Sequence, residues 1–184
     1  PRAVGRSLRQ STTGSAIWQA HRSRQDERDH MKLAMQIGYS GGFEQSVAQV
    51  QTLEKAGMDI VYVAEAYGYD GVSLMGYLAA KTETVQIAAG ILPIYTRTPT
   101  LLAMTAAGVD DLSHGRCILG LGASGPQVIE GFHGVPYDAP IGRTREIVQI
   151  CRQVWAREEP VVHDGRPPVI LREAQFSAEK FSSR

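Results

Sequence analysis

The sequence has 184 residues, enough for one domain with a hydrophobic core, and its 43% hydrophobic and 21% charged residues are typical of a globular protein. Lysine plus arginine equals aspartate plus glutamate at 19 each, so no net field attracts nucleic acid or an acidic membrane surface. No apolar run reaches the roughly 18 residues that span a bilayer. The two cysteines, Cys117 and Cys151, lie in apolar segments without metal-ligand spacing, which indicates reduced, buried thiols in a cytoplasmic protein.

The first 30 residues differ in composition from the rest of the chain. They hold six arginines, no lysine and no acidic residue before Asp26. Such a composition can mark an organelle transit peptide. The segment begins with Pro1 and has no helical apolar stripe, so we favour a disordered leader over 1–30 that lies outside the domain.

From Met31 onward the sequence alternates between strand and helix patterns. Residues 31–38 form a short apolar strand candidate, and apolar residues from Phe43 to Leu53 recur at helical spacing. Residues 59–65 are rich in β-branched side chains and predict a second strand. The apolar segment 71–80 predicts a second helix.

The second half of the pattern repeats the first. Residues 84–92 predict a strand, and Thr98 can cap a helix with Pro99 in its first position. A fourth strand is expected at 116–122, and a helix from Pro140 carries apolar residues up to Trp155.

Four β-α units therefore occupy 31–159. Strands that are apolar on both faces fit a parallel sheet covered by helices, either an open doubly wound sheet or part of a (β/α)8 barrel. A complete barrel typically needs about 250 residues. The remaining residues, 160–184, have no periodicity and predict an irregular tail. The expected fold is a partial (β/α)8 barrel of about four units.

Ligands of parallel α/β sheets bind beyond the carboxyl ends of the strands. The segments expected there are 38–40, 65–67, 90–92 and 122–125. In the last of these, Gly122 and Gly125 let backbone N–H groups turn inward, and Ser124 adds a hydroxyl. A helix starting near Pro126 would favour a bound phosphate, although an ordinary turn between strand and helix explains the same glycines.

Few side chains in these segments carry chemistry. Glu65 can accept a hydrogen bond from a cofactor or assist proton transfer, but it can equally cap the turn before the next helix. His133 is either a donor near the rim or an ordinary surface residue. Arg97 either binds an anion or is solvated. Neither a catalytic triad nor metal-ligand spacing stands out, so a cofactor is expected to supply any chemistry.

Three segments resemble the luciferase-like monooxygenase family, in particular its branch that uses the deazaflavin coenzyme F420. They are YVAEAYGYDGVS from Tyr62, IAAGILPIYTRTP from Ile87 and GLGASGPQVIEGFHGVPY from Gly120. The likeness covers roughly Met31 to Glu159 and fades after about Arg166. It implies a (β/α)8 barrel that transfers a hydride between C5 of the deazaflavin and an organic substrate. Relatives that use FMN carry out oxygen-dependent chemistry instead.

The resemblance also assigns roles by position. Glu65, as the catalytic residue, and Ala66 would lie beside the cofactor ring. Gly90 and Ile91 match a bulge that often holds a non-prolyl cis peptide behind the ring. The cofactor and phosphate contacts of the fourth strand would come from Gly122, Ala123, Ser124 and Gly125. No residue is assigned to a metal.

Some features of the family do not carry over. Members that oxidise a sugar phosphate have a histidine after the acidic residue and a glutamate in the fourth loop. Here Ala66 and the Gly125-Pro126 region occupy those places, so a sugar phosphate is not expected. Much of the family's phosphate site lies in the second half of the barrel, which this sequence lacks.

The resulting hypothesis is a fragment of an F420-dependent oxidoreductase that acts on a small organic molecule. The alternatives are a fragment of an FMN-dependent monooxygenase, or a catalytically silent half-barrel that acts only in association. Because four strands leave two parallel edges open, we expect a homo-oligomer or self-association through the sheet edges.

Overall fold

The computed structural model describes residues 31–38, 42–165 and 170–174. The chain divides into two units, Pro1–Lys32 and Leu33–Arg184, and the elements below belong to the second. The predicted leader over 1–30 lies outside the described residues. So do Tyr39 and Ser40, which the sequence places at the end of the first strand.

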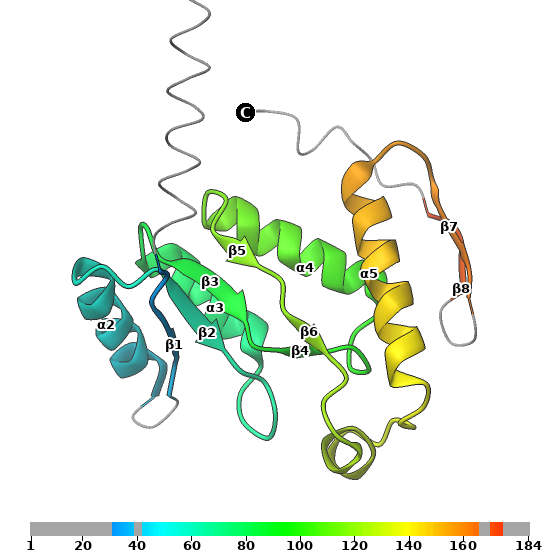
Figure 1. The fold of residues 1–184 in the computed structure, drawn as a ribbon, viewed down its shortest axis with the longest axis horizontal. Helices are drawn as coiled ribbons and strands as arrows, with labels where there is room; N and C mark the ends of the chain where they lie inside the picture. Colours follow the sequence, from blue (N-terminus) through cyan, green and yellow to red (C-terminus); the bar gives the residue numbers. More distant parts are fainter. Residues whose placement is uncertain (1–30, 39–41, 166–169, 175–184) are drawn as a thin grey trace, which may run out of the picture. The chain divides into compact units, whose positions relative to one another are not determined.

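The core of the second unit is a four-stranded parallel sheet (Figure 1). Its strands follow one another in chain order as β1 (Ala34–Gln36), β2 (Ile60–Val63), β3 (Gln86–Ala89) and β5 (Cys117–Ile118). The strand order of a doubly wound sheet reverses at a switch point, whereas barrel strands follow in sequence. The partial-barrel prediction is therefore confirmed, and the doubly wound alternative is wrong.

Helices follow the strands as predicted. They are α2 (Gly42–Lys55), α3 (Gly71–Lys81), α4 (Pro99–Leu112) and α5 (Pro140–Ala156). Local capping explains where α3 and α4 begin: Asp70 accepts a hydrogen bond from the Ser73 N–H, and Thr98 accepts one from the Leu101 N–H. Pro99 occupies the first position of α4.

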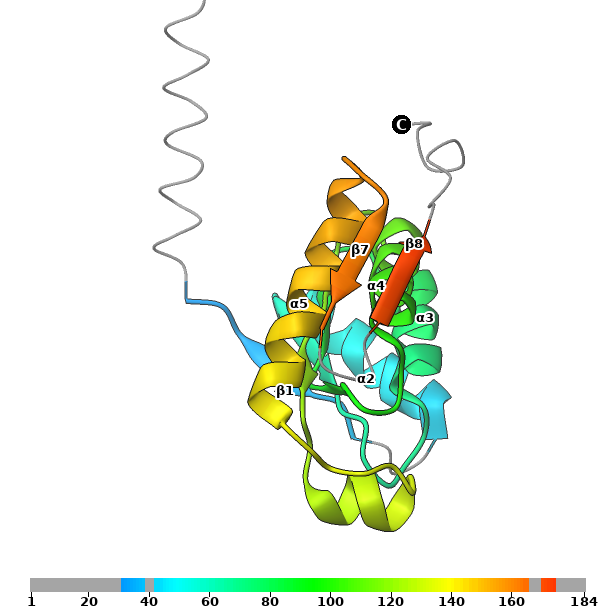
Figure 2. The same cartoon turned by 90° about the vertical axis from the view of Figure 1, so that its right-hand side faces the viewer.

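The two faces of the sheet differ in burial at β2, whereas the successive residues Ile87, Ala88 and Ala89 of β3 are all buried, as expected for a strand that is apolar on both faces. Val61 and Val63 are fully buried, whereas Tyr62 between them is 37% exposed. Helices α2, α3 and α4 lie on one side of the sheet (Figure 2). Because successive side chains of a strand point to opposite faces, only alternate residues enter the helix-covered core.

The third and fourth predicted strands are each interrupted. Residues 84–92 divide into β3 and β4 (Leu92–Pro93), separated by a cis peptide bond between Gly90 and Ile91. Residues 116–122 divide into β5 and β6 (Leu121–Gly122), and β4 pairs with β6 in a second parallel sheet. The Leu92 N–H donates to the Gly120 carbonyl at 2.9 Å, so pairing continues past both breaks.

The C-terminal segment is more regular than predicted. Strands β7 (Val161–Asp164) and β8 (Ile170–Ala174) pair in an antiparallel sheet, so the expected irregular tail is wrong over these residues. The 160–184 sequence shows little alternation that would predict this pairing.

Both cysteines are free, as the sequence indicated; Cys151 is buried and Cys117 half-buried. Burial raises the pKa of each thiol to about 11, so both are protonated at neutral pH. Among the described residues, every helix is too short or too polar to cross a membrane.

Candidate functional site

Three of the predicted segments meet at the carboxyl end of the sheet. A Cβ on Gly90 would lie 3.0 Å from the Tyr62 ring, and a Cβ on Gly122 would lie 3.1 Å from the Ile91 side chain. The ring centroids of Tyr67 and Phe132 are 5.5 Å apart. The loops that follow the second, third and fourth strands therefore share one end of the sheet.

The glycines at this end permit close approach of neighbouring segments. The Gly90 N–H donates to the Val63 carbonyl at 2.7 Å, which joins the end of β3 to the end of β2. A Cβ on Gly120 would lie 1.9 Å from the Ala89 carbonyl oxygen, a distance that no side chain tolerates. Small residues and bare backbone thus form the surface between the third and fourth strands.

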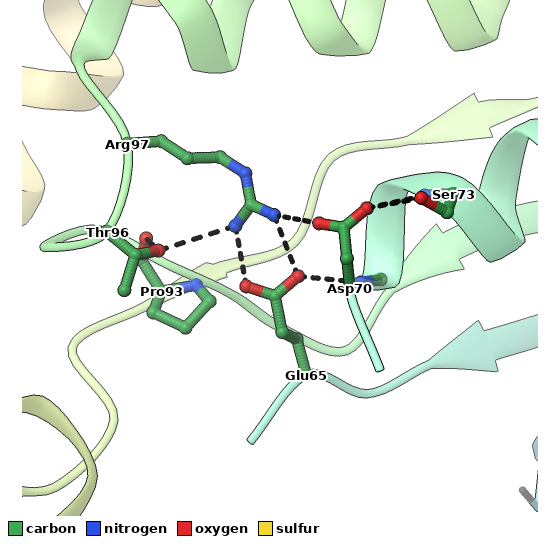
Figure 3. A network of polar contacts seen from close by, with 7 residues as sticks. Glu65, Asp70, Ser73, Pro93, Thr96 and Arg97 are labelled. Atoms are coloured by element: carbon green, nitrogen blue, oxygen red, sulfur yellow. Dashed lines mark hydrogen bonds and ion pairs between the residues drawn. The ribbon is translucent and has the colours of Figure 1, made fainter. Parts of the chain in front are cut away.

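Glu65 follows β2 and has hydrogen-bond donors on both carboxylate oxygens (Figure 3). Arg97 Nη1 donates to Oε1 at 2.6 Å, and Arg97 Nη2 donates to Oε2 at 2.8 Å. The Gly71 N–H, at the start of α3, also donates to Oε2 at 2.7 Å. The capping role that the sequence left open for Glu65 is therefore present.

Arg97 lies in the loop between β4 and α4, and its side chain is only 12% exposed. Its Nη2 also contacts Asp70 Oδ1 at 2.5 Å, so the guanidinium bridges two carboxylates. The hydrogen bond to Glu65 raises the pKa of Arg97 above its ordinary value, against the effect of burial. Arg97 is therefore neither solvated nor free to bind an external anion, because its guanidinium group binds the Glu65 and Asp70 carboxylates.

Partial burial acts to raise the pKa of Asp70, but hydrogen bonds from the Ser73 hydroxyl and backbone N–H, with the charge of Arg97, lower it overall. Asp70 therefore stays ionised well into the acidic range.

The loop after the fourth strand holds Ser124 with a φ of 57°, and this residue is exposed. The helix expected near Pro126 is the six-residue π-helix η1 (Gln127–Phe132). The N–H groups of Val128 and Ile129 both donate to the Gly125 carbonyl at 3.0 Å. Since these two donors are used within the turn, a phosphate here would rely on the main chain of 122–125 and the Ser124 hydroxyl.

His133 ends η1 and is half-buried, so it is not an ordinary surface histidine. Its ring lies 5.0 Å from that of Phe132. Its Nε2 is shielded from solvent and has no hydrogen-bond partner among the described residues. Those residues also contain no cluster of three His, Cys, Asp or Glu side chains that could hold a metal ion.

Comparison with known proteins agrees with this architecture. The model of the family described as luciferase-like monooxygenase matches residues 26–178, past the point near Arg166 where the sequence likeness was expected to fade. The chain belongs to the luciferase-like monooxygenase family.

The names of individual luciferase-like relatives and structures mention two cofactors, F420 and FMN. A Mycobacterium tuberculosis protein named as a coenzyme F420-dependent oxidoreductase is 44% identical over 137 residues, which are 73% of this chain and 40% of the relative. The structure of the coenzyme F420-dependent tetrahydromethanopterin reductase of Methanopyrus kandleri matches with a TM-score of 0.66, at 20% identity over 74% of this chain and 43% of that one. The oxygenating constituent of 3,6-diketocamphane monooxygenase from Pseudomonas putida, in complex with FMN, matches with a TM-score of 0.65, at 19% identity and the same coverage.

The chain thus spans less than half the length of these relatives. The structural matches show the shared fold. Relatives that use F420 and a relative that binds FMN both occur, so the comparisons support these two cofactors without separating them for this chain.

The residues present fit a planar cofactor ring in this luciferase-like fold. Gly90 is half-buried next to the Tyr62 side chain, and Gly122 lies next to the Ile91 side chain, so bare backbone and apolar side chains border the strand ends. Ala66 and Ser124 are exposed at the same end. Arg97 and Arg143 lie at this end and form ion pairs with carboxylates. Their positive charge is therefore largely neutralised and attracts an anionic cofactor tail only weakly.

Sequence reasoning missed the aromatic residues of the site. Tyr67 and Phe132 are exposed, and Tyr95 and Tyr137 lie with ring centroids 5.1 Å apart, where the Tyr95 hydroxyl donates to the Asp138 carbonyl at 2.6 Å. The run AYGYD in the loop after the second strand could have indicated them, because aromatic residues in exposed loops often mark a binding surface.

Proposed function

We propose that the chain is the N-terminal part of a coenzyme F420-dependent oxidoreductase that transfers a hydride between the deazaflavin and a small organic substrate. The observation that carries the proposal is the 44% identity with a relative named for F420 dependence. The glycine-lined strand ends, at which Gly90 and Gly122 meet neighbouring side chains, support it. A cytoplasmic location is part of the proposal and is supported by the two free thiols.

Each predicted site residue has a role in this proposal. Gly90 and Ile91 would lie behind the cofactor ring, and Ala66 would lie at its edge. Contacts to the polar part of the cofactor would come from the main chain of Gly122, Ala123, Ser124 and Gly125 and from the Ser124 hydroxyl. The bound coenzyme supplies the carbon centre that gives or accepts the hydride.

Glu65 is the proposed catalytic residue, and its hydrogen bonds limit how it acts. Three donors already occupy its carboxylate, one on Oε1 and two on Oε2, which leaves an acceptor site on Oε1. A carboxylate held in this way is suited to accept a hydrogen bond from a ring N–H and to stabilise positive charge nearby, because its position costs no reorganisation. It is less suited to carry a proton between sites.

Binding of the cofactor can be tested by titrating the chain with F420 and with FMN and following the fluorescence of each. We expect F420 to bind, and Glu65→Gln to weaken binding by about tenfold, the effect of losing a hydrogen bond to a charged group. Asp138→Asn is the matched control, since Asp138 is an exposed carboxylate paired with Arg143 at the same end. Binding of FMN alone would favour the monooxygenase alternative, and binding of neither would favour a silent half-barrel.

We also propose that the chain associates with itself through its open sheet edges, β1 and β5. The Ile37 N–H donates to the Tyr62 carbonyl across the β1–β2 pair, so by alternation the Gln36 N–H points to the open edge. Gln36→Pro should therefore reduce association, measured by sedimentation velocity, without removing a bond inside the sheet. Leu101→Glu, on the exposed face of α4, is the comparison variant. Loss of association in Leu101→Glu alone would indicate that the chains associate through their helices and not through the sheet edges.

A further inference from the structure

The loop between β2 and α3 is closed at both ends by a single side chain. Glu65 begins this loop and Asp70 ends it, and Arg97 binds both carboxylates (Figure 3). We call these three residues the Arg97 clasp. Since Arg97 belongs to the next β-α connection, the clasp also ties two neighbouring loops together.

The two arms of the clasp differ in strength. The Glu65 carboxylate is 9% exposed and binds Arg97 through two parallel hydrogen bonds. The Asp70 carboxylate is 48% exposed, so water screens its contact with Arg97 and the contact contributes little by itself. The buried, bidentate contact with Glu65 therefore fixes the position of the Arg97 guanidinium, and this position in turn determines the exposed contact with Asp70.

Between the two arms the loop presents two large aromatic side chains to solvent. Tyr67 is 61% exposed, and its ring meets the edge of Phe132 from η1, which is 56% exposed. Tyr69 meets Phe43 at the start of α2 in the same edge-to-face manner, with centroids 4.9 Å apart. Such exposed, mutually packed rings mark a surface that binds another apolar group.

The positive charge beside these rings, the Arg97 guanidinium, is not available to a ligand. The donors of Arg97 that reach Glu65 and Asp70 are used within the clasp, and the Asp70 Oδ2 oxygen accepts from Ser73. The clasp carries two negative charges and one positive charge, so it does not attract an anion. The chemistry of this surface therefore suits an uncharged, flat, apolar molecule better than a phosphate ester.

We propose that Arg97 is a positioning residue that holds Tyr67 against Phe132, and that these two rings form one side of a subsite for a neutral planar aromatic substrate. This inference rests on the proposed function, because it names the substrate class of the same site. Arg97 acts through the loop and touches no substrate, whereas Tyr67 and Phe132 contact the substrate ring.

The test uses the full chain and two probes with the same naphthyl ring, neutral 2-naphthol and anionic 2-naphthyl phosphate, followed by their fluorescence. We expect 2-naphthol to bind more tightly than the phosphate. Tyr67→Ala should weaken 2-naphthol binding about tenfold through loss of ring contacts. Arg97→Gln should weaken it about fivefold although Arg97 does not contact the probe, and Arg145→Gln, an exposed arginine of α5, should leave it unchanged.

A second readout separates positioning from general stability. With 3-fluorotyrosine incorporated, the ¹⁹F resonance assigned to Tyr67 should move toward its unfolded position in Arg97→Gln, while the resonance of Tyr77 in α3 stays in place. If Arg97→Gln does not fold, Arg97→Lys keeps the charge and loses the fork, and the same shift and weaker binding are expected.

Unchanged 2-naphthol binding in Tyr67→Ala, or an unmoved Tyr67 resonance in both Arg97 variants, would overturn the inference. Tighter binding of the phosphate probe would also overturn it. These outcomes are independent of the F420 titration, so the proposed function can stand when this inference fails. Failure of F420 to bind, with the clasp results as expected, would instead remove only the proposed function.

Discussion

Charged side chains at the amino end of the sheet, where the strands begin, bind mainly backbone groups, whereas those at the carboxyl end are also joined to one another by ion pairs. At the amino end, Glu54 accepts from the N–H groups of Glu83, Thr84 and Val85 at 2.6–2.9 Å. Arg116 donates to the carbonyls of Ala79, Thr82, Val85 and Ser113 at 2.7–3.1 Å. At the carboxyl end, Arg97 joins Glu65 and Asp70.

This difference indicates that the amino end of the sheet contributes to stability and the carboxyl end to binding. At the amino end, the backbone groups that Glu54 and Arg116 contact are satisfied by these two charged side chains, which holds the turns in place. At the carboxyl end, three side chains hold the loops while glycine backbone and the rings of Tyr67 and Phe132 stay accessible. Parallel barrels place stability and activity at these same opposite ends.

The largest effect is expected where the third and fourth strands approach each other. Gly120→Ala would place a Cβ 1.9 Å from the Ala89 carbonyl oxygen, and the overlap should lower the free energy of unfolding by about 3 kcal/mol or more. Gly108→Ala is the control, because its Cβ would meet open space in α4 and should stabilise the helix by up to about 1 kcal/mol. Urea denaturation measures both. Equal stability of the two variants would contradict the close approach.

The next largest effect tests the amino end. Arg116→Met would leave several carbonyls without their donors and should lower the free energy of unfolding by about 2–3 kcal/mol. Cofactor and 2-naphthol affinity of the folded fraction should not change, since the clasp is at the other end. Arg152→Met, at an exposed position of α5, should stay within about 0.5 kcal/mol of the parent chain. A loss of ligand affinity in Arg116→Met would show that the two ends are coupled.

A smaller effect comes from Glu54 and depends on pH. Burial acts to raise the pKa of Glu54, but hydrogen bonds from Val85, Thr84 and Glu83 outweigh it and lower the pKa below the ordinary 4.5. The stabilisation from this lowered pKa is therefore present above pH 4.5 and is lost as the pH falls through the folded-state pKa. Glu54→Gln should lower stability by about 1 kcal/mol at pH 7. The difference between variant and parent should shrink in urea titrations as the pH falls below 4.5, and a constant difference would contradict the ionic role.

The smallest effect concerns the thiols. With their pKa raised to about 11, Cys117 and Cys151 should react with iodoacetamide at pH 8 about two orders of magnitude more slowly than a free cysteine. Mass spectrometry of the intact chain follows the reaction, and urea-unfolded chain is the control. Rapid alkylation of Cys117 in the folded chain would show that β5 opens at the edge of the sheet.

The sequence by itself determined the order of the elements and much of their ends. The helical periodicity of α2 and α4 and the Thr98 cap depend on residues close together in the chain, so they can be predicted from a local sequence pattern. Gly90, Gly122 and the family likeness likewise followed from short segments. The roles proposed for these residues stay predictions.

Only the tertiary structure decided which side chains meet. Glu65 and Arg97 are 32 residues apart in the chain, and the sequence left two roles open for each of them. The arrangement of the β-α units in the fold places the two side chains in contact and decides between these roles. The breaks in the third and fourth strands, the short π-helix η1 and the pairing of Tyr67 with Phe132 arose in the same way. A single sequence encodes local propensity directly, but a contact across units depends on strand register and helix packing, which are set by the whole fold.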